Sequence, residues 1–304
     1  MGRTPRQQRT NRFSMVKILL KLLLALLMLG LLQGCGSLFY WPEEGLRGTP
    51  DQLGIEYQPV NLKTSNNLNL HAWWFPSRAE EPAKPQGLIY YLHGNAENIS
   101  THFMGMTWIT NHGWEVFILD YRGYGLSEGK PSIAGVHHDA YMGLKWAIAK
   151  AKEQQLPLVV LGQSIGGATA VTLVANATAE EQQQISGLVV DSAFSGYQRI
   201  AREKLSSSWV TWAFQYPLSW TITDRYSPEK QLNKLPADLS LLFLHSCADQ
   251  VIPCSHSQRL YQQVQEPKTY LEAQEARHTE MLSQLKWRRE LVAWLDAYVL
   301  DALD

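Results

Sequence analysis

The sequence predicts an α/β fold, in which a mainly parallel β-sheet is covered by helices on both faces. Short apolar runs, typical of strands buried on both faces, alternate with helical patterns of ten or more residues. The chain has 304 residues and is 45% hydrophobic, which is enough for a large core. We see no internal repeat and no long low-complexity tract, so we expect one main domain over residues 55–304.

The elements can be placed in order along the chain. A polar turn at 64–67 separates two strand-like runs, and Gly113 and Pro157 are stop signals for the helices before them. The expected strands are 55–62, 68–75, 87–92, 115–119, 158–161, 187–190, 239–244 and 269–272. The expected helices are 101–112, 133–155, one from the end of the 158–161 strand to about 178, and 281–300.

One interval breaks this alternation. About fifty residues separate the strands that end at 190 and begin at 239, and they are rich in aromatic side chains. An interval of that length usually carries structure of its own, often a lid over an active site. We therefore predict an apolar cap at 192–236 that covers an acyl or aryl substrate. The alternative is that the aromatic side chains pack against the sheet. They are Trp209, Trp212, Phe214, Tyr216, Trp220 and Tyr226.

The bulk charge excludes some classes of function. The net charge is −1 and the sequence pI is about 6.8, so no electrostatic argument supports nucleic-acid binding. The sequence has no C-x-x-C, no H-E-x-x-H and no phosphate-binding loop with Gly-Lys-Ser/Thr. We expect no metal site and no nucleic-acid partner.

Residues 1–35 have the pattern of a targeting segment. Residues 1–14 are Arg-rich, and the apolar stretch 22–32 has the length of a signal-peptide core and is short for a bilayer span of about 20 residues. Met15 offers a second start for this signal. The stretch ends in Leu32-Gln33-Gly34-Cys35, which resembles the lipobox of bacterial lipoproteins, where the cysteine thiol carries the lipid.

The resemblance implies lipidation of Cys35, and Gly36 after it is similar to outer-membrane lipoproteins. The alternative is an uncleaved signal anchor in which Cys35 is only a buried thiol. Either form makes the membrane a partner, and we expect the chain to be anchored in a bacterial cell envelope and to face the periplasm. Residues 36–54 are rich in Gly and Pro and are interpreted as a tether.

The stretch after the 158–161 strand has the pattern G-x-S-x-G. It runs Gly162-Gln163-Ser164-Ile165-Gly166, with an apolar strand before it and a small-residue helix after it. In a sharp strand-to-helix turn, neighbouring backbone crowds the positions two before and two after the central residue, and glycine fits there. We therefore predict that Ser164 is a nucleophile beside the N-terminal end of a helix.

A serine nucleophile needs a base, and the base needs an acid to orient it. In this architecture the chain order is nucleophile, acid, histidine, each after a strand. Asp249 follows the 239–244 strand and His278 follows the 269–272 strand, so these two are the predicted acid and base. Asp191, which also follows a strand, and His256, expected on the next helix, are the competitors.

A tetrahedral intermediate needs two backbone donors for its oxyanion. The N–H of Ile165 is one candidate. The second is expected from the loop after the 87–92 strand, at Asn95 or Ala96. We interpret His93 as a residue that holds this loop rather than as a catalytic group.

Four motifs, HGNAEN (93–98), DYRGYGLS (120–127), GQSIGG (162–167) and HSCADQVIP (245–253), resemble the α/β-hydrolase superfamily. They are most similar to its membrane-associated Bem46/ABHD13/ABHD17-like branch, over about residues 55–300. The resemblance implies an eight-stranded sheet and hydrolysis of esters, thioesters or sometimes peptides without a cofactor. It also implies a structural turn, without a catalytic role, at Asp120.

The sequence departs from the family pattern in two places. Ala276-Arg277 precede His278 where the family usually has Gly, and Cys247 stands where the family usually has Gly. If Cys35 is lipidated, Cys247 and Cys254 remain as an even pair that brackets Asp249. In an oxidising compartment they would form a disulfide that holds the acid loop. The alternative is two free thiols.

These observations predict a serine acyl hydrolase with Ser164, His278 and Asp249 as its triad. Its substrate is expected to be a small ester or thioester with a short to medium acyl chain, and the aromatic interval is the only basis for that length. A serine peptidase acting on short peptides is the first alternative, because the same fold and triad serve both. A non-catalytic envelope lipoprotein with this fold is the second.

Overall fold

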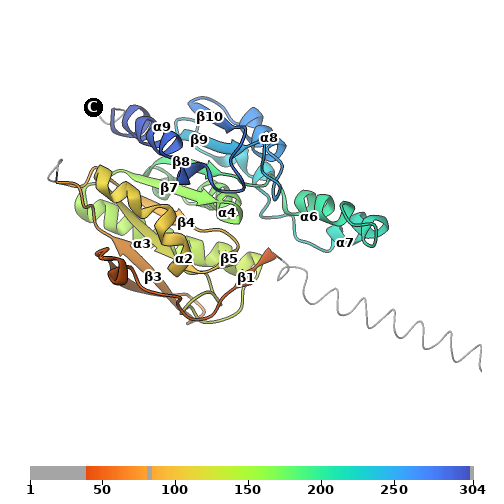
Figure 1. Cartoon of the computed structure of the whole chain (residues 1–304), viewed down its shortest axis with the longest axis horizontal. Coiled ribbons are helices and arrows are strands. Elements are labelled where there is room, and N and C mark those ends of the chain that lie inside the picture. The colour runs from red at the N-terminus through yellow and green to blue at the C-terminus, as the bar shows by residue number, and fades with distance from the viewer. Residues whose placement is uncertain (1–38, 81–83, 302–304) are drawn as a thin grey trace, which may run out of the picture.

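The computed structural model describes residues 39–80 and 84–301 and has the predicted α/β architecture (Figure 1). The strands are β1 Trp41–Pro42, β2 Gln58–Lys63, β3 Asn69–Phe75, β4 Gly87–Leu92, β5 Ala96–Glu97, β6 Trp114–Leu119, β7 Leu158–Gln163, β8 Ile185–Asp191, β9 Ser240–Ser246 and β10 Lys268–Ala273. Eight of them form the central sheet in the order β10-β9-β8-β7-β4-β6-β3-β2. β3 pairs antiparallel with β2 and β6, and the other pairs of this sheet are parallel.

Helices cover both faces of this sheet. The α-helices of the described residues, including α6 and α7 outside these two layers, are α2 Ile99–His102, α3 Ile133–Gln154, α4 Ile165–Asn176, α5 Ala179–Gln182, α6 Tyr197–Ser206, α7 Gln215–Trp220, α8 Ser255–Gln263 and α9 Leu285–Leu295. Alternate residues of β4 enter two separate apolar clusters: Leu88 and Tyr90 pack with α3, α4 and α8, whereas Ile89 and Tyr91 pack with α2 and α9. A strand buried on both faces needs this apolar run, which explains why β4 has no polar position.

Two predicted helices were wrong in detail. Where one helix was expected at 101–112, α2 begins at Ile99 and is followed by two 3₁₀ segments, Phe103–Gly105 and Thr107–His112. The Asn98 side chain accepts the N–H of Ser100 and starts the helix early, and Gly105 and the β-branched residues after it disfavour its continuation. The expected 281–300 helix is interrupted by extended backbone at Gln284 and ends in a π-helical turn, Asp296–Leu300.

The segment interpreted as a tether packs on the domain from residue 39 onward. β1 pairs with β5 in a two-stranded parallel sheet that the sequence did not predict, and Tyr40 is buried. The N–H of Trp41 donates to Asn95 Oδ1 at 3.1 Å, so this segment touches the loop after β4. The leader and Cys35 lie outside the described residues. Within the described ranges, we find no helix that is both long and apolar enough to cross a bilayer.

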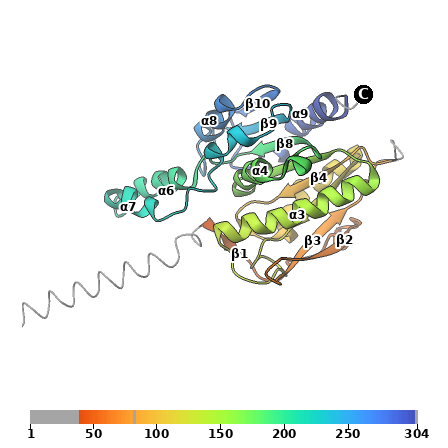
Figure 2. The same ribbon diagram turned by 180° about the vertical axis from the view of Figure 1, so that it is seen from behind.

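The interval 192–236 contains α6, the 3₁₀ segment Trp212–Phe214 and α7, and α6 and α7 project from one end of the molecule (Figures 1 and 2). We call residues 192–236 the cap. Tyr226 is partly buried against the core, where its ring stacks on His137 of α3 at 4.4 Å between centroids. The other five aromatic side chains singled out in this interval are exposed. The alternative that these aromatic side chains pack against the core of the domain therefore holds for Tyr226 and fails for the other five.

His137 makes the attachment of the cap sensitive to acid. Burial lowers the pKa of His137 to about 3, and its Nε2 lies 3.2 Å from the Tyr197 hydroxyl at the start of α6. Because the folded pKa lies below the unfolded value, this group's contribution to stability is complete above about pH 6.5 and is lost as the pH falls toward 3. The unfolding free energy of the wild type should fall between pH 7 and pH 5. We expect His137→Phe to make this fall smaller by about 2 kcal/mol. Urea unfolding at both pH values measures this; an unchanged acid loss would contradict it.

Candidate active site

Ser164 lies in a sharp turn between β7 and α4, in a backbone conformation that side chains rarely adopt (φ 59°, ψ −121°). The glycines around it have the steric role that the sequence predicted. A Cβ on Gly162 would lie 2.2 Å from Gly166 O, and one on Gly166 would lie 2.1 Å from Leu92 O. The turn is therefore pressed against the end of β4, and a side chain at either glycine would displace backbone.

Three predicted residues from three separate loops lie within hydrogen-bond distance of one another. His278 Nε2 lies 2.9 Å from Ser164 Oγ, and His278 Nδ1 lies 2.6 Å from Asp249 Oδ2. Because an ionised carboxylate only accepts, the network assigns the proton to Nδ1 and leaves Nε2 to accept from the serine hydroxyl. The three side chains have the relative positions that a nucleophile, a base and an orienting acid require.

Asp249 is held in its ionised form by several donors. Its Oδ1 accepts the N–H groups of Val251 and Ile252, at 2.7 and 2.9 Å, and its Oδ2 faces both His278 and His245. Burial by itself would raise the pKa of Asp249, but the hydrogen bonds to His245 and His278 and those of the backbone hold the pKa well below its ordinary value. These donors therefore favour the charged form of the Asp249 carboxylate.

His245 is the residue of this network that the sequence analysis missed. It is fully buried at the end of β9, and its Nε2 lies 2.9 Å from Ile252 O and 3.3 Å from Asp249 Oδ2. Its Nδ1 lies 2.6 Å from Ser257 Oγ on α8. His245 thus joins the strand, the acid loop and the next helix. Its place four residues before the acid was visible in the HSCAD motif.

The two competing residues are engaged elsewhere. Asp191 Oδ2 accepts from Gln163 Nε2 at 2.9 Å and its Oδ1 accepts from the Ser192 hydroxyl, while burial raises its pKa. His256 lies on α8 as expected, with Nδ1 3.0 Å from the Ser195 N–H and Nε2 2.9 Å from Glu203. Neither contacts Ser164 in the way that a triad member would.

Cys247 and Cys254 are joined in a disulfide across the acid loop, with 5.0 Å between their Cα atoms. The bond closes a short loop that contains Asp249. The N–H of Cys247 also donates to Ala273 O at the end of β10, which ties the acid loop to the segment that leads to His278. The covalent link and this hydrogen bond restrict the acid and the base together.

The loop after β4 approaches Ser164 from the other side. Gly94 lies close to the serine, since a Cβ built on it would be in ordinary contact with the Ser164 Cβ at 3.8 Å. The Tyr124 hydroxyl donates to Asn95 O, and His102 Nε2 lies 2.9 Å from Ala96 O. Ile165 is the first residue of α4, where a helix has N–H groups without intrahelical partners. Asn95, Ala96 and Ile165 line the same pocket as Ser164.

His93 and Asp120 lie below this loop and are fully buried. Burial lowers the pKa of His93 well below its ordinary value, and its Nδ1 lies 2.8 Å from Gly94 O. Asp120 Oδ1 accepts the N–H of Ile99 and so holds the start of α2. Neither side chain lies in the pocket that contains Ser164. Both positions agree with the structural roles that we expected.

Ser164 and His278 open into a pocket of about 670 Å³ that lies between the sheet and the cap. The cap lines it with Phe194 and with aliphatic side chains, and none of the predicted aromatic residues at 209–226 is among them. The aliphatic members are Ile200, Ala201, Leu205, Leu218 and Ile222. Lys204 is the cap's charged residue in this lining, and no Asp or Glu occurs among the described residues that form it.

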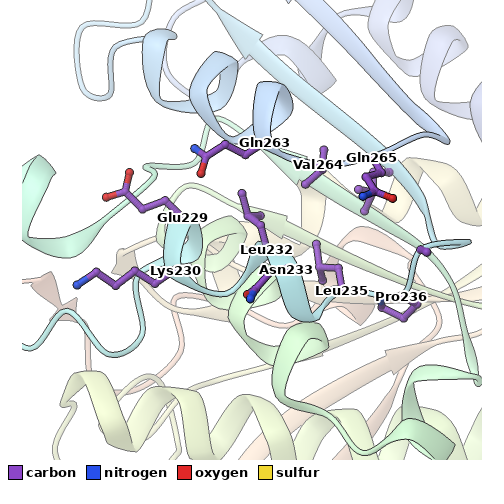
Figure 3. Close-up of a pocket in the computed structure, with 11 residues that line it drawn as sticks. Glu229, Lys230, Leu232, Asn233, Leu235, Pro236, Gln263, Val264 and Gln265 are labelled. Atoms are coloured by element: carbon purple, nitrogen blue, oxygen red, sulfur yellow. The ribbon is translucent and has the colours of Figure 1, made fainter.

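A second cavity, of about 520 Å³, lies away from Ser164 (Figure 3). The segment 229–237, Leu241 and the stretch 263–265 form its walls, and no member of the Ser164–His278–Asp249 arrangement reaches it. Across the part of the chain that the structure covers, we find no group of three or more His, Cys, Asp or Glu side chains that could hold a metal ion.

Comparison with known proteins identifies the family. Residues 83–235 match the hydrolase family described as Hydrolase_4, serine aminopeptidase S33. The uncharacterized protein YfhR of Salmonella typhi is 30% identical over 252 residues, which is 81% of each chain. The chain belongs to the α/β-hydrolase family. The protein bem46 of Schizosaccharomyces pombe, 29% identical over 209 residues, covers 67% of this hydrolase and 64% of its own length, in agreement with the Bem46-like resemblance.

Solved structures show the same fold. The Pyrococcus furiosus esterase Pf2001 superimposes with a TM-score of 0.67 at 19% identity and covers 88% of this chain and 100% of its own. A soluble variant of the monoglyceride lipase of Saccharomyces cerevisiae gives a TM-score of 0.60 at 17% identity, over 85% of this chain and 99% of its own. The predicted fold and family are therefore confirmed, and the chain is a hydrolase by family.

Proposed function

We propose that this hydrolase cleaves carboxylic esters or thioesters through an acyl-enzyme on Ser164. The line from Ser164 Oγ through His278 to Asp249, with distances of 2.9 and 2.6 Å, is the observation that carries the proposal. In this arrangement Ser164 is the nucleophile, His278 the base and Asp249 the acid that orients the imidazole.

The order of the chemical steps is set by these positions. Ser164 Oγ attacks the carbonyl carbon of the substrate while its proton passes to His278 Nε2. The N–H of Ile165 and one from Asn95 or Ala96 stabilise the negative oxygen that forms. The alcohol or thiol leaves with the proton from His278, and the acyl group stays on Ser164. Water then loses a proton to His278 and attacks the acyl carbon; the bond to Ser164 Oγ breaks, His278 returns the proton to that oxygen, and the acid is released.

The pocket supports an acyl substrate over a peptide with a free amino terminus. An α-ammonium group that enters an apolar pocket needs a carboxylate partner, because an unpaired buried charge is costly. The described residues that line this pocket contribute apolar side chains, the neutral polar side chains at the Ser164 end, His102 and Lys204, but no carboxylate. The serine-aminopeptidase description of the matched family makes peptide hydrolysis the second candidate.

Replacing the nucleophile and the acid separates catalysis from scaffolding. We expect Ser164→Ala to abolish labelling by a fluorophosphonate probe and to lower kcat for ester hydrolysis by roughly 10⁶-fold. Asp249→Asn leaves His278 with the wrong tautomer and should cost roughly 10⁴-fold in kcat. Asp191→Asn is the matched control, since that carboxylate makes no hydrogen bond to His278, and it should retain most of the activity. A wild-type chain that does not react with the probe would support a non-catalytic envelope protein.

A substrate panel decides between the two hydrolytic candidates. We expect p-nitrophenyl esters to be cleaved with a higher kcat/KM than aminoacyl p-nitroanilides, with short to medium acyl chains preferred because the cap closes a pocket of about 670 Å³. Enlarging Leu218 to Trp, on the cap side of that pocket, should shift the preference toward shorter chains. Amide preference would favour the peptidase, and equal rates for all chain lengths would contradict the acyl-pocket proposal.

We also propose that residues 1–35 attach the hydrolase to a bacterial envelope membrane, facing the periplasm, through a lipid on Cys35. The lipobox-like sequence 32–35 supports this proposal. Cells grown with radiolabelled palmitate should incorporate label into the wild-type chain but not into Cys35→Ala. A chain that stays in the membrane fraction without label would instead have an uncleaved signal anchor.

A further inference from the structure

One short segment of the cap carries an unusual group of exposed apolar side chains. Six of them occur within twelve residues, and each is more than half exposed, Trp209 to 91%. We call this group the aromatic face; its members are Trp209, Val210, Trp212, Phe214, Tyr216 and Trp220. A soluble surface rarely leaves so many large apolar side chains of one short segment uncovered. The cap therefore has apolar side chains over the pocket and further apolar side chains in solvent.

The sequence around the aromatic face favours a lipid surface as its occupant. Residues 205–223 contain no Asp, Glu, Lys, Arg or His, and Trp and Tyr are the side chains enriched where a membrane meets water. The charged residues that flank this interval include the exposed Lys204 and Arg225. The neighbouring acids are already engaged, Glu203 with His256 and Asp224 with Lys230. Free cations beside an uncharged aromatic surface suit anionic headgroups.

The path of the chain places the N-terminal segment at the root of the cap. The ring of Phe39 lies 5.2 Å, between centroids, from that of Tyr197, the first residue of α6, and 6.4 Å from that of Phe194. Cys35 is four residues earlier in the sequence, a distance of at most about 14 Å along an extended chain. A lipid on Cys35, or an apolar span that ends there, therefore brings the membrane to the side of the molecule where the cap projects (Figure 1).

We propose that the aromatic face docks onto the surface of a lipid bilayer and inserts its tryptophan side chains at the interface. Leu218 of α7 faces the pocket while Tyr216 and Trp220 of the same helix are exposed, so docking brings the covered pocket close to the lipid. The docking rests on surface chemistry and chain path, and does not require that Ser164 is catalytic. If the proposed hydrolysis also holds, the substrate is an acyl ester that reaches the pocket from the membrane.

Quenching of tryptophan fluorescence by brominated lipids tests this directly. The full-length chain is reconstituted in phosphatidylcholine–phosphatidylglycerol vesicles with and without bromine on the acyl chains. We expect strong quenching for the wild type and for Ser164→Ala. The variant with Trp209→Ser, Trp212→Ser and Trp220→Ser should lose most of it. Equal quenching of wild type and triple variant would overturn the proposal.

A matched control adds one exposed tryptophan elsewhere. Leu285 is 68% exposed at the start of α9, a helix that lies on the other side of the molecule from α6 and α7 (Figures 1 and 2). Adding Leu285→Trp to the triple variant should raise the emission without restoring the quenching. Restored quenching would mean that the membrane contact is not specific to the aromatic face, and would overturn the proposal.

A second measurement leaves the aromatic face intact. Ser207→Cys, two residues before Trp209, carries a polarity-sensitive nitrobenzoxadiazole label. The emission of this label should shift to the blue when vesicles are added, and the shift is measured relative to the parent chain treated with the same label. The same label on Leu285→Cys should not shift. Thermal unfolding shows that each variant is folded, and hydrolysis of a water-soluble ester reports separately on the proposed function. Docking without hydrolysis would refute only the proposed function, and hydrolysis without docking would refute only this inference.

Discussion

The contact between the turn at Ser164 and the end of β4 is the constraint on which the rest of the site depends. Gly162 and Gly166 have no room for a side chain: a Cβ on Gly162 would meet the backbone of Gly166, and one on Gly166 would meet the backbone of Leu92 and His93. This close approach holds Ser164 in a strained conformation, and strained residues persist only where the surroundings over-determine them. The same approach brings the loop after β4, with its backbone donors, beside the nucleophile.

The acid is positioned by a different principle. Asp249 lies on a loop, and a loop by itself would allow it many positions. Two backbone N–H groups, the buried His245 and the Cys247–Cys254 disulfide leave it only one. These groups also keep the carboxylate charged, so geometry and electrostatics act together. The base needs less support of its own, because the acid on one side and the serine on the other define its orientation.

Features that depend on strand order could be predicted from the sequence, whereas those that depend on side-chain direction were missed. Parallel strands end at one edge of a sheet, so residues after β7, β9 and β10 had to converge, and Ser164, Asp249 and His278 could be chosen in advance. The role of His245 could not be predicted, because the hydrophobic periodicity of a buried strand does not show what a histidine within it binds. The pairing of β1 with β5 joins segments of two residues, too short for any pattern. The aromatic interval was recognised, but composition does not say which face a side chain takes.

The cap illustrates why that last distinction matters for function. A cover made of tryptophan over the pocket would restrict the substrate by bulk, whereas the mainly aliphatic lining that the cap provides there can adapt to a flexible acyl chain. The large aromatic side chains at 209–220 remain exposed instead, and apolar surface of this kind lowers solubility and favours contact with an apolar or interfacial partner. If Cys35 is anchored in a bilayer, the short segment after it keeps the cap near that bilayer, which would cover the exposed aromatic side chains without a second protein. The pocket would then lie close to acyl groups of the membrane.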